Sequence, residues 1–336
     1  MPEFLDERLD DPVVLEASDH VLRPLAQAGA RLRRDAADAR AAIASLAGEP
    51  RPRAVIAVGP EARLLRAVLE PVCPVPFVAW PSLGLPGWVG PLDLVVVLGG
   101  GQAALTCAHE ALRRGSRLLV TADEESDLAR RSASRATTLL PVSTNDPLTA
   151  AIVALIALHE WGLGTPVSAD AVAGAMDAVA VESGHAVDVS ANPAKAVALE
   201  LADAQPLIWG GSVLAARASR RIAEALRTAS GRVTLAADAS ELLSILASTH
   251  PRDPFADPFE GATEERPVLM ILDDGLGDAA DEEQHEALAG NALVADVRVC
   301  TLSHAGGSAM ERYATVLAKG RFAAAYLQIG LGREHR

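Results

Sequence analysis

The sequence predicts an α/β protein that consists of two doubly wound parallel sheets with helices on both faces. Three observations support this prediction: apolar runs of about five to seven residues, glycine-bearing turns directly after several of them, and longer amphipathic stretches in between. Short runs that are apolar throughout are typical of parallel strands buried on both faces. The order of strand, turn and helix restarts in the second half of the chain, which predicts one domain over residues 1–165 and a similar one over residues 166–336.

The first half contains four predicted strands. The apolar runs lie at residues 54–58, 75–80, 92–98 and 116–121, and the amphipathic stretches at 61–70 and 102–114 predict helices between them. The longest apolar run, 148–158, is too short to cross about 30 Å of hydrocarbon as a helix, so we expect a buried helix there.

The second half repeats this pattern. Strands are predicted at residues 206–209, 233–236, 267–272 and 295–302, a helix at 212–226, and one or two closing helices at 308–328. A helix over 194–202 has a well-formed start, because Asn192 can cap it and Pro193 suits the first helical position. Residues 249–265 are rich in Pro and Asp and predict a long loop.

Length and composition exclude several classes of protein. A chain of 336 residues with 50% hydrophobic side chains is long enough for two cores and too apolar to be largely disordered. Its 30 basic and 44 acidic side chains give a net charge of −14, which argues against a nucleic-acid partner. The 3 cysteines are far apart and form no C-x-x-C pair, which favours a reducing, cytoplasmic location. The acidic start of the chain lacks the layout of a signal peptide, and we expect no membrane partner.

Two glycine-rich turns follow predicted strands and are candidate phosphate sites. The run Gly99-Gly100-Gly101-Gln102 lies between a strand and a helix, where backbone N–H groups can bind an anion. The run Gly210-Gly211-Ser212 has the same position in the second half and adds a hydroxyl group. Neither turn has the spacing of a dinucleotide site or of a Walker A sequence. The simpler alternatives are a tight turn that needs positive φ for the first run and a plain N-cap at Ser212 for the second.

The sequence contains no complete catalytic or metal-binding motif. No set of His, Asp and Glu residues has zinc-ligand spacing, and no G-x-S-x-G nucleophile elbow is present. His250 and His304 lie in predicted loops of the second half, where catalytic groups tend to gather. We therefore predict neither a metal ion nor a cofactor.

Three stretches of the chain suggest a family. The first is Asn192-Pro193-Ala194-Lys195 with the strand that follows it and the helix that carries Arg220-Arg221. The second is the C-terminal run with Gly307-Ser308, Glu311-Arg312, Gly320, Ala325-Tyr326-Leu327 and Gly330, and the third is the proline-led stretch at 147–162. With these features the chain resembles the bifunctional phosphoglucose/phosphomannose isomerases, which are built from two sugar isomerase (SIS) domains.

The resemblance implies two SIS folds, a homodimer and a sugar-phosphate ligand. Enzymes of this family interconvert aldose and ketose phosphates: a carboxylate moves a proton between neighbouring carbons, while hydroxyl and amide groups hold the phosphate. The chain departs from the family at these very groups. Residues 98–103 lack the hydroxyl groups of the phosphate loop, Leu148 replaces an arginine, Ala229 replaces the glutamate base, and no histidine lies at 243–246.

These departures lead us to expect a sugar-phosphate-binding SIS protein whose isomerase activity is weak or lost. Loss of a general base alone lowers a rate by about 10²–10⁴. One alternative is an active aldose–ketose isomerase in which Glu241, His250 or His304 moves the proton. Another is a structural or regulatory partner of a sugar-phosphate enzyme.

Overall fold

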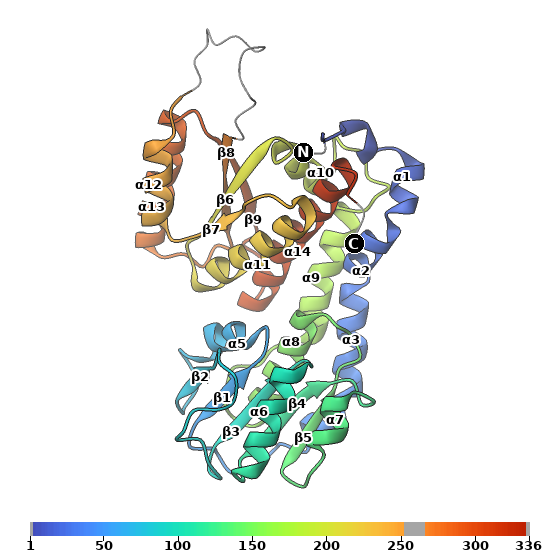
Figure 1. Cartoon of the computed structure of the whole chain (residues 1–336), viewed down its shortest axis with the longest axis vertical. Coiled ribbons are helices and arrows are strands. Elements are labelled where there is room, and N and C mark those ends of the chain that lie inside the picture. Colours follow the sequence, from blue (N-terminus) through green and yellow to red (C-terminus); the bar gives the residue numbers. More distant parts are fainter. Residues whose placement is uncertain (1–2, 252–265, 334–336) are drawn as a thin grey trace. The chain divides into compact units, whose positions relative to one another are not determined.

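The computed structural model describes residues 3–251 and 266–333, and the chain divides into two compact units (Figure 1). The first unit comprises residues 28–173, and the second comprises residues 1–27 together with residues 174–336. Each unit contains one sheet whose neighbouring strands are all parallel, with helices on both faces. The predicted α/β class with two doubly wound parallel sheets is therefore confirmed.

The first unit is organised around a five-stranded sheet. Its strands are β1 (Val55–Val58), β2 (Phe77–Ala79), β3 (Leu94–Leu98), β4 (Arg117–Ala122) and β5 (Thr137–Pro141), and their order is β2-β1-β3-β4-β5. Every residue of β1 and β3 is buried, as expected for strands that are covered on both faces. The strand order reverses between β1 and β3, and such a reversal leaves a crevice at the carboxyl ends of the strands.

Helices cover both faces of this sheet. α6 (Gln102–Arg113) and α7 (Asp127–Ser132) pack on one face, and α5 (Ala62–Leu69) and α8 (Pro147–Glu160) pack on the other. α8 is buried along almost its whole length, which confirms the buried helix predicted from the apolar run at 148–158. The remaining helices of this region are α3 (Ala28–Asp38), α4 (Arg40–Ala44) and α9 (Ala169–Glu182), of which α9 continues into the second unit.

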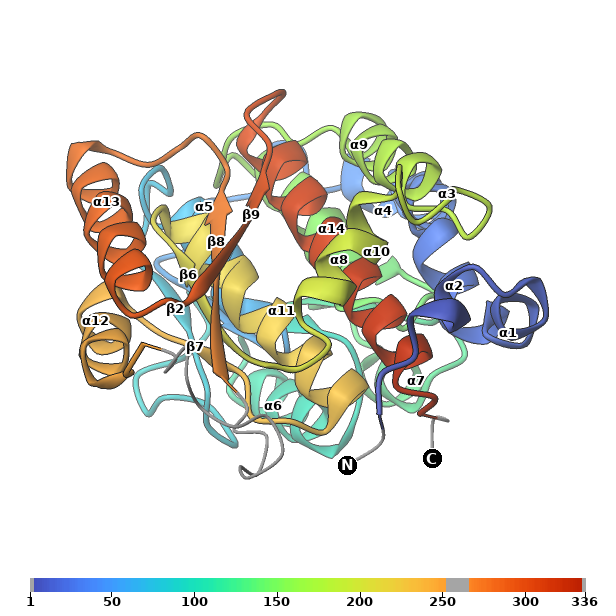
Figure 2. The ribbon, with the colours of Figure 1, turned by 90° about the horizontal axis from the view of Figure 1, so that it is seen from above.

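The second unit contains a four-stranded sheet with the same reversal of strand order. Its strands are β6 (Ala204–Gly210), β7 (Leu235–Ala236), β8 (Arg266–Asp273) and β9 (Arg298–Ser303), in the order β7-β6-β8-β9. α12 (Ala239–Ser248) and α13 (Ala279–Val294) cover one face of this sheet. The other face is covered by α10 (Pro193–Glu200), α11 (Val213–Ser230) and α14 (Ala309–Gly330) (Figure 2).

The N-terminal residues pack on the second unit. They form η1 (Asp6–Leu9), α1 (Pro12–Ala17) and α2 (Asp19–Ala26). The Leu5 N–H donates to Gly330 O at 3.0 Å, and the Phe4 ring lies so close to Gly330 that a Cβ there would come within 2.1 Å of it. The sequence assigned these residues to a first domain that ends at residue 165, whereas the compact units divide between residues 173 and 174 and group residues 1–27 with the second unit. Local sequence patterns do not show which distant helix a terminal segment packs against.

Several elements differ in detail from those that the sequence pattern indicates. β5 is only partly apolar and ends in Pro141, and the pattern therefore does not mark it as a strand. Of the one or two closing helices predicted at 308–328, the structure has one, α14, which is continuous from Ala309 to Gly330. The N-cap at Asn192 is confirmed, because its Oδ1 accepts from the N–H groups of Ala194 at 3.0 Å and Lys195 at 3.1 Å. Most of the predicted loop at 249–265 lies outside the described residues.

Candidate functional site

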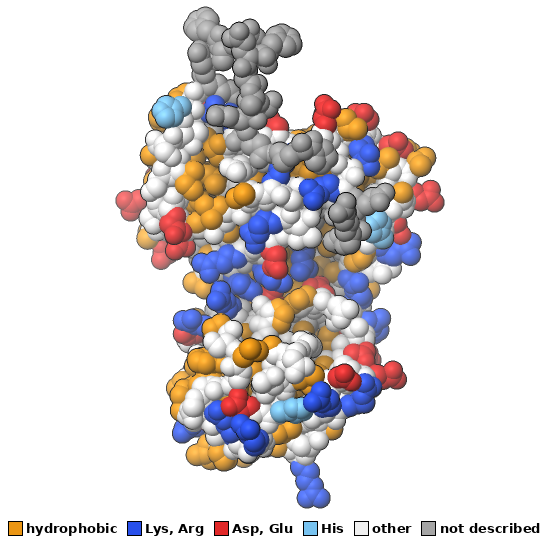
Figure 3. Space-filling view, in the orientation of Figure 1, with side chains coloured by type: hydrophobic (Ala, Val, Ile, Leu, Met, Phe, Trp, Pro, Cys, Tyr) orange, Lys and Arg blue, Asp and Glu red, His pale blue; other side chains and the backbone are white. Residues whose placement is uncertain are grey.

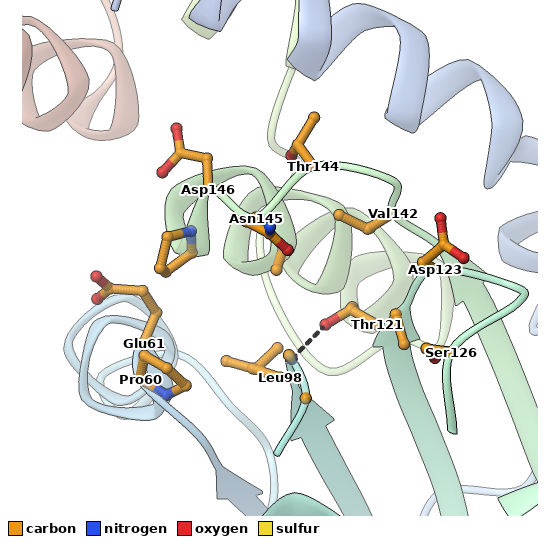
Figure 4. Close-up of a pocket in the computed structure, with 15 residues that line it drawn as sticks. Pro60, Glu61, Leu98, Thr121, Asp123, Ser126, Val142, Thr144, Asn145 and Asp146 are labelled. Carbon is orange, nitrogen blue, oxygen red and sulfur yellow. Dashed lines mark hydrogen bonds between the residues drawn. The ribbon is translucent and has the colours of Figure 1, made fainter. Parts of the chain in front are cut away.

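A cavity lies at the carboxyl ends of the strands of the first unit (Figure 4). It has a volume of about 240 Å³, and its lining residues lie at or just after the ends of β1, β3, β4 and β5. Because β1 and β3 both contribute, the cavity lies where the strand order reverses, which is the position where doubly wound sheets bind ligands. Pockets for drug-sized ligands have roughly 300–1,000 Å³, so this cavity suits a smaller molecule.

The glycine run that the sequence singles out is only partly in this cavity. Gly99 and Gly100 line it, and Gly101 and Gln102 form the start of α6 just beyond it. Gly99 and Gly101 have φ angles of 74° and 98°, which favour glycine, whereas a Cβ at any of the three glycines would meet no atom within 4 Å. The Gly99 N–H already donates to Thr121 O at 3.1 Å and approaches Thr121 Oγ1 at 3.4 Å. The amides that remain for an anion are therefore those after Gly99.

Hydroxyl, amide and carboxylate groups surround the rest of the cavity. Thr121, Ser126, Thr144 and Asn145 line it, and Thr144 Oγ1 is buried without a hydrogen-bond partner among the described residues. Figure 4 places the carboxylates of Glu61 and Asp146 on one side and that of Asp123 on the other. Each of these groups can accept a hydrogen bond from a hydroxyl group of a ligand.

Among the residues that the structure describes, no Lys or Arg lines this cavity. Leu148, which replaces the arginine implied by the resemblance, is buried, and its N–H donates to Asp146 Oδ1 at 3.2 Å. Asp146 is thus the N-cap of α8, followed by Pro147 at the first helical position. Asp followed by Pro is a recognisable signal for the start of a helix, and it could have drawn attention to the neighbouring Thr144 and Asn145.

The second unit has a cavity at the equivalent edge of its own sheet. It has a volume of about 270 Å³ and lies at the carboxyl ends of β6 and β8. Gly211 and Ser212 line it, whereas Gly210 serves packing, because a Cβ there would come within 2.4 Å of the Ala215 backbone. Five carboxylates line this cavity: Asp273, Asp274, Asp278, Asp281 and Glu282.

Ser212 is the N-cap of α11 and hydrogen-bonds to one of these carboxylates. Its Oγ accepts from the Ala215 N–H at 3.0 Å and donates to Asp274 Oδ2 at 2.6 Å, and both side chains are buried. A carboxylate therefore occupies the position from which the Ser212 hydroxyl would donate to a phosphate. The neighbouring acidic side chains would also repel a phosphate in this cavity.

The candidate catalytic residues Glu241 and His250 lie at opposite ends of α12. Glu241 is in the first turn, and its Oε2 accepts from the Asp238 N–H at 3.3 Å in a capping box. His250 follows the last turn, is exposed, and its carbonyl accepts from Arg266 Nη2 at 2.9 Å. A helix of 10 residues is roughly 15 Å long, so the structure does not bring the two side chains together.

His304 follows β9 and lies beside β8. Its N–H donates to Asp273 O at 2.9 Å. The carboxylate near it is Glu311, whose pKa is lowered chiefly by hydrogen bonds from the Ser308 hydroxyl and N–H, with a smaller effect of the His304 charge. Glu311 is thereby engaged in the capping box of α14. Glu241, His250 and His304 line neither sheet-edge cavity.

Ala229, at the position of the glutamate base in the resemblance, lies on α11 and is buried. Its methyl group cannot accept a proton. Among the described residues, no group of three His, Cys, Asp or Glu side chains is arranged to hold a metal ion, and no helix is both long and apolar enough to cross a membrane.

Comparison with protein families identifies the second half of the chain. Residues 190–334 match the family described as the bacterial phospho-glucose isomerase C-terminal SIS domain. This match covers the first two stretches on which the resemblance was based, so the resemblance is confirmed there. A comparison with curated proteins finds no matching relative.

Solved structures share the fold over nearly the whole chain. Tagatose-6-phosphate ketose/aldose isomerase from Escherichia coli is 12% identical with a TM-score of 0.64, and the match covers 93% of this chain and 92% of that one. The C-terminal domain of glucosamine-fructose-6-phosphate aminotransferase from Francisella tularensis is 10% identical with a TM-score of 0.61, covering 93% and 96%. A glucose-6-phosphate isomerase like protein from Thermus thermophilus is 17% identical with a TM-score of 0.51, covering 88% and 91%. At these identities the likeness shows the fold.

Proposed function

We propose that the chain binds a phosphorylated hexose in the cavity of the first unit, with weak or no isomerase activity, and the match of residues 190–334 to the bacterial phospho-glucose isomerase C-terminal SIS domain supports this proposal. The observation that carries this proposal is the cavity at the reversal of strand order, which is lined by Gly99, Gly100 and several polar side chains and lies next to the start of α6. Glucose 6-phosphate and mannose 6-phosphate are the ligands that the family resemblance suggests.

The phosphate binds at the start of α6. The first N–H groups of a helix have no partner within it, and the positive end of the helix dipole favours an anion there. Gly101, the N-cap residue, has no side chain that could take these donors, and Gly100 leaves open space in front of them. Backbone amides thus replace the hydroxyl groups that the family uses in this loop.

The sugar hydroxyl groups bind the polar side chains across the cavity. Asp123 Oδ1 accepts from the Glu125 N–H at 2.8 Å, which orients this carboxylate at the end of β4. The buried Thr144 Oγ1 gains a hydrogen bond from a bound ligand, because it lacks one among the described residues. Carboxylates accept hydrogen bonds only, so those of the cavity suit the hydroxyl groups of the sugar and not its phosphate group.

The weak or lost isomerase activity follows from the side chains at two positions. Ala229 provides no base, and Leu148 provides no cation. The alternative of an active isomerase with relocated residues gains no support from Glu241, His250 and His304, because they do not form a cluster around either sheet-edge cavity. A role as a structural or regulatory partner of a sugar-phosphate enzyme is favoured by no particular contact. A homodimer and a cytoplasmic location remain predictions, and light scattering of the purified chain tests the first.

Calorimetric titration with glucose 6-phosphate tests the proposed site. We expect binding by the wild-type chain, at least about tenfold weaker binding of unphosphorylated glucose, and a similar loss for Gly100→Asp, which places a negative charge before α6. Gly100→Asn is the matched control, since it adds a side chain of the same shape without the charge, and a Cβ at Gly100 meets no atom within 4 Å. Equal binding of glucose 6-phosphate by the wild-type and Gly100→Asp chains would overturn the proposed site.

A further inference from the structure

The first unit contains a buried carboxylate, that of Asp35 on α3, which the proposed function does not use. Figure 3 shows Asp and Glu side chains of this unit at its surface, whereas Asp35 is fully buried. Removing a carboxylate from water costs free energy unless hydrogen bonds replace its hydration. The groups that form hydrogen bonds with Asp35 therefore indicate what this side chain does.

Both oxygens of the Asp35 carboxylate accept hydrogen bonds from the segment 142–146. Oδ1 accepts from the Ser143 hydroxyl at 2.9 Å, and Oδ2 accepts from the Thr144 N–H at 3.3 Å. Arg34, the neighbour of Asp35, joins this cluster, because its Nη2 donates to Ser143 Oγ at 2.7 Å and to Asp35 Oδ1 at 3.3 Å. Two successive residues of α3 thus hold two successive residues of the segment.

The segment 142–146 connects β5 to α8 and contributes one side of the cavity (Figure 4). At its beginning the Val142 N–H donates to Ala122 O at 3.0 Å, and at its end Asp146 caps α8. These contacts hold the two ends of the segment. Asp35 holds the residues between them.

Thr144 and Asn145 lie in the middle of this segment, and both line the cavity. Thr144 gives its backbone N–H to Asp35, whereas its Oγ1 is buried without a hydrogen-bond partner among the described residues. A buried hydroxyl group normally has a partner, and a ligand in the cavity can supply one. The positions of the Thr144 hydroxyl and of the neighbouring Asn145 amide therefore depend on where Asp35 holds the backbone.

We propose that Asp35 is a positioning residue, which holds Thr144 and Asn145 where they bind the hydroxyl groups of the sugar. This inference rests on the proposed function, because it concerns the sugar end of the same cavity. Asp35 does not line the cavity, so it acts through the two residues that do. Loss of its carboxylate weakens binding of the sugar and leaves phosphate binding at the start of α6 unchanged.

Calorimetric titrations of Asp35→Asn with glucose 6-phosphate and with inorganic phosphate test this role. The Asn side chain has one acceptor oxygen, so it cannot replace both oxygens of the carboxylate. We expect glucose 6-phosphate to bind about tenfold more weakly than to the wild-type chain, and inorganic phosphate to bind within about twofold of it. General damage to the fold would weaken the binding of both ligands alike.

Asp93→Asn is the matched control. Asp93 is also fully buried and paired with an arginine, Arg53, whose side chain is 55% exposed like that of Arg34. Its carboxylate accepts from Arg53 at 2.9 and 2.6 Å and from the Gly90 N–H at 2.8 Å. Asp93 lies directly before β3, at the amino ends of the strands, whereas the cavity lies at their carboxyl ends. Asp93→Asn should therefore lower the stability without a change in glucose 6-phosphate binding.

A double-mutant cycle tests whether Asp35 acts through the segment. Thr144→Val removes the hydroxyl group that binds the sugar, so Asp35→Asn should weaken glucose 6-phosphate binding less in this background than in the wild-type chain. Fully additive effects would contradict the proposal. Ser143→Ala keeps the test valid if Asp35→Asn does not fold, because Ser143 is exposed and gives one of the two hydrogen bonds to Asp35. We expect about threefold weaker binding in Ser143→Ala.

Failure of the proposed function would look different, because the wild-type chain itself would then bind no glucose 6-phosphate. Amide hydrogen exchange gives a readout that needs no ligand. The Thr144 N–H should exchange at least about tenfold faster in Asp35→Asn than in the wild-type chain, and at the wild-type rate in Asp93→Asn. Unchanged exchange of this amide together with unchanged glucose 6-phosphate affinity in folded Asp35→Asn would overturn the positioning role.

Discussion

Lys195 Nζ donates to Asp10 Oδ1 at 2.8 Å across 185 residues of sequence. The lysine side chain is fully buried, whereas the aspartate side chain is 45% exposed. Lys195 also donates to the carbonyls of Val187 at 2.7 Å and His185 at 3.3 Å, so all three of its N–H groups have partners. One of the only two lysines in the chain thus holds the N-terminal segment and the loop before α10 together.

Lys195→Met should lower the free energy of unfolding by about 3 kcal/mol, because it removes the buried ammonium group that donates to Asp10 and to two loop carbonyls. Asp10→Asn should lower it by only about 1 kcal/mol, since the half-exposed amide oxygen can still accept from Lys195. Denaturant unfolding of the two variants measures both effects, with Lys319→Met as the control at a less buried lysine. A larger loss for Asp10→Asn than for Lys195→Met would contradict this account.

Ser212→Ala should destabilise the second unit without weakening phosphate binding. The substitution removes the N-cap of α11 and the hydroxyl donor to the buried Asp274, together worth about 2 kcal/mol. Ser212→Asp should be worse, because it places a second carboxylate beside that of Asp274, whose Oδ2 lies 2.6 Å from Ser212 Oγ. Thermal unfolding and a parallel glucose 6-phosphate titration test this, and a loss of binding in folded Ser212→Ala would restore Ser212 as a ligand-binding residue.

The purified chain should not interconvert glucose 6-phosphate or mannose 6-phosphate with fructose 6-phosphate at enzyme-like rates. Ala229 lacks a proton acceptor, and the buried Leu148 lacks a charge. Ala229→Glu alone should not rescue turnover, because the phosphate loop and the cation also differ from the family. A coupled assay, with an authentic isomerase as the positive control, measures the turnover of the chain. A turnover of about 10 s⁻¹ by the chain itself would refute this prediction.

Gly320→Ala should destabilise the chain even though alanine favours a helix. The propensity gain is at most about 1 kcal/mol, whereas forcing a methyl group against Ile222 in a packed core costs about 1–3 kcal/mol. The new Cβ would meet three carbon atoms of Ile222 at 2.4–2.9 Å, so a small movement of one terminal atom cannot relieve the clash. Combining Gly320→Ala with Ile222→Val, which removes Cδ1, should recover part of the loss in a double-mutant cycle. Additive effects of the two substitutions would indicate that the contact does not limit the approach of the helices.

Cys300 should react slowly with alkylating agents in the folded chain. Burial, assisted by the charge of Glu200, raises the pKa of its thiol from 9.0 to about 12. At pH 8 we expect labelling more than about tenfold slower than in the unfolded chain, measured by mass spectrometry. The folded chain holds this proton to higher pH than the unfolded chain, so the contribution of Cys300 to stability is present below about pH 9 and is lost as the pH rises towards 12. Cys300→Ser should remove this part of the loss of stability at alkaline pH.

The class of fold is readable from the sequence because it depends on local periodicity. Apolar runs such as 92–98 have no polar face, and this alone indicates a parallel strand buried on both sides. The cap at Asn192 and the buried helix α8 are likewise local, since their signals lie within a few residues. The glycine run at 99–102 is also recognisable from the sequence, because a strand, a glycine turn and a helix follow one another directly in the chain.

The composition of each site depends on contacts between residues far apart in the chain. Asp274 lies 62 residues from Ser212, yet its carboxylate accepts the hydrogen bond of the Ser212 hydroxyl that a phosphate would need. Leu5 pairs with Gly330, and α14 approaches α11 where Gly320 faces Ile222. Periodicity specifies which side of an element is buried, but it carries no information about which partner buries it. Only the packed tertiary structure, in which sterics and burial select one set of neighbours, decides where the charges meet.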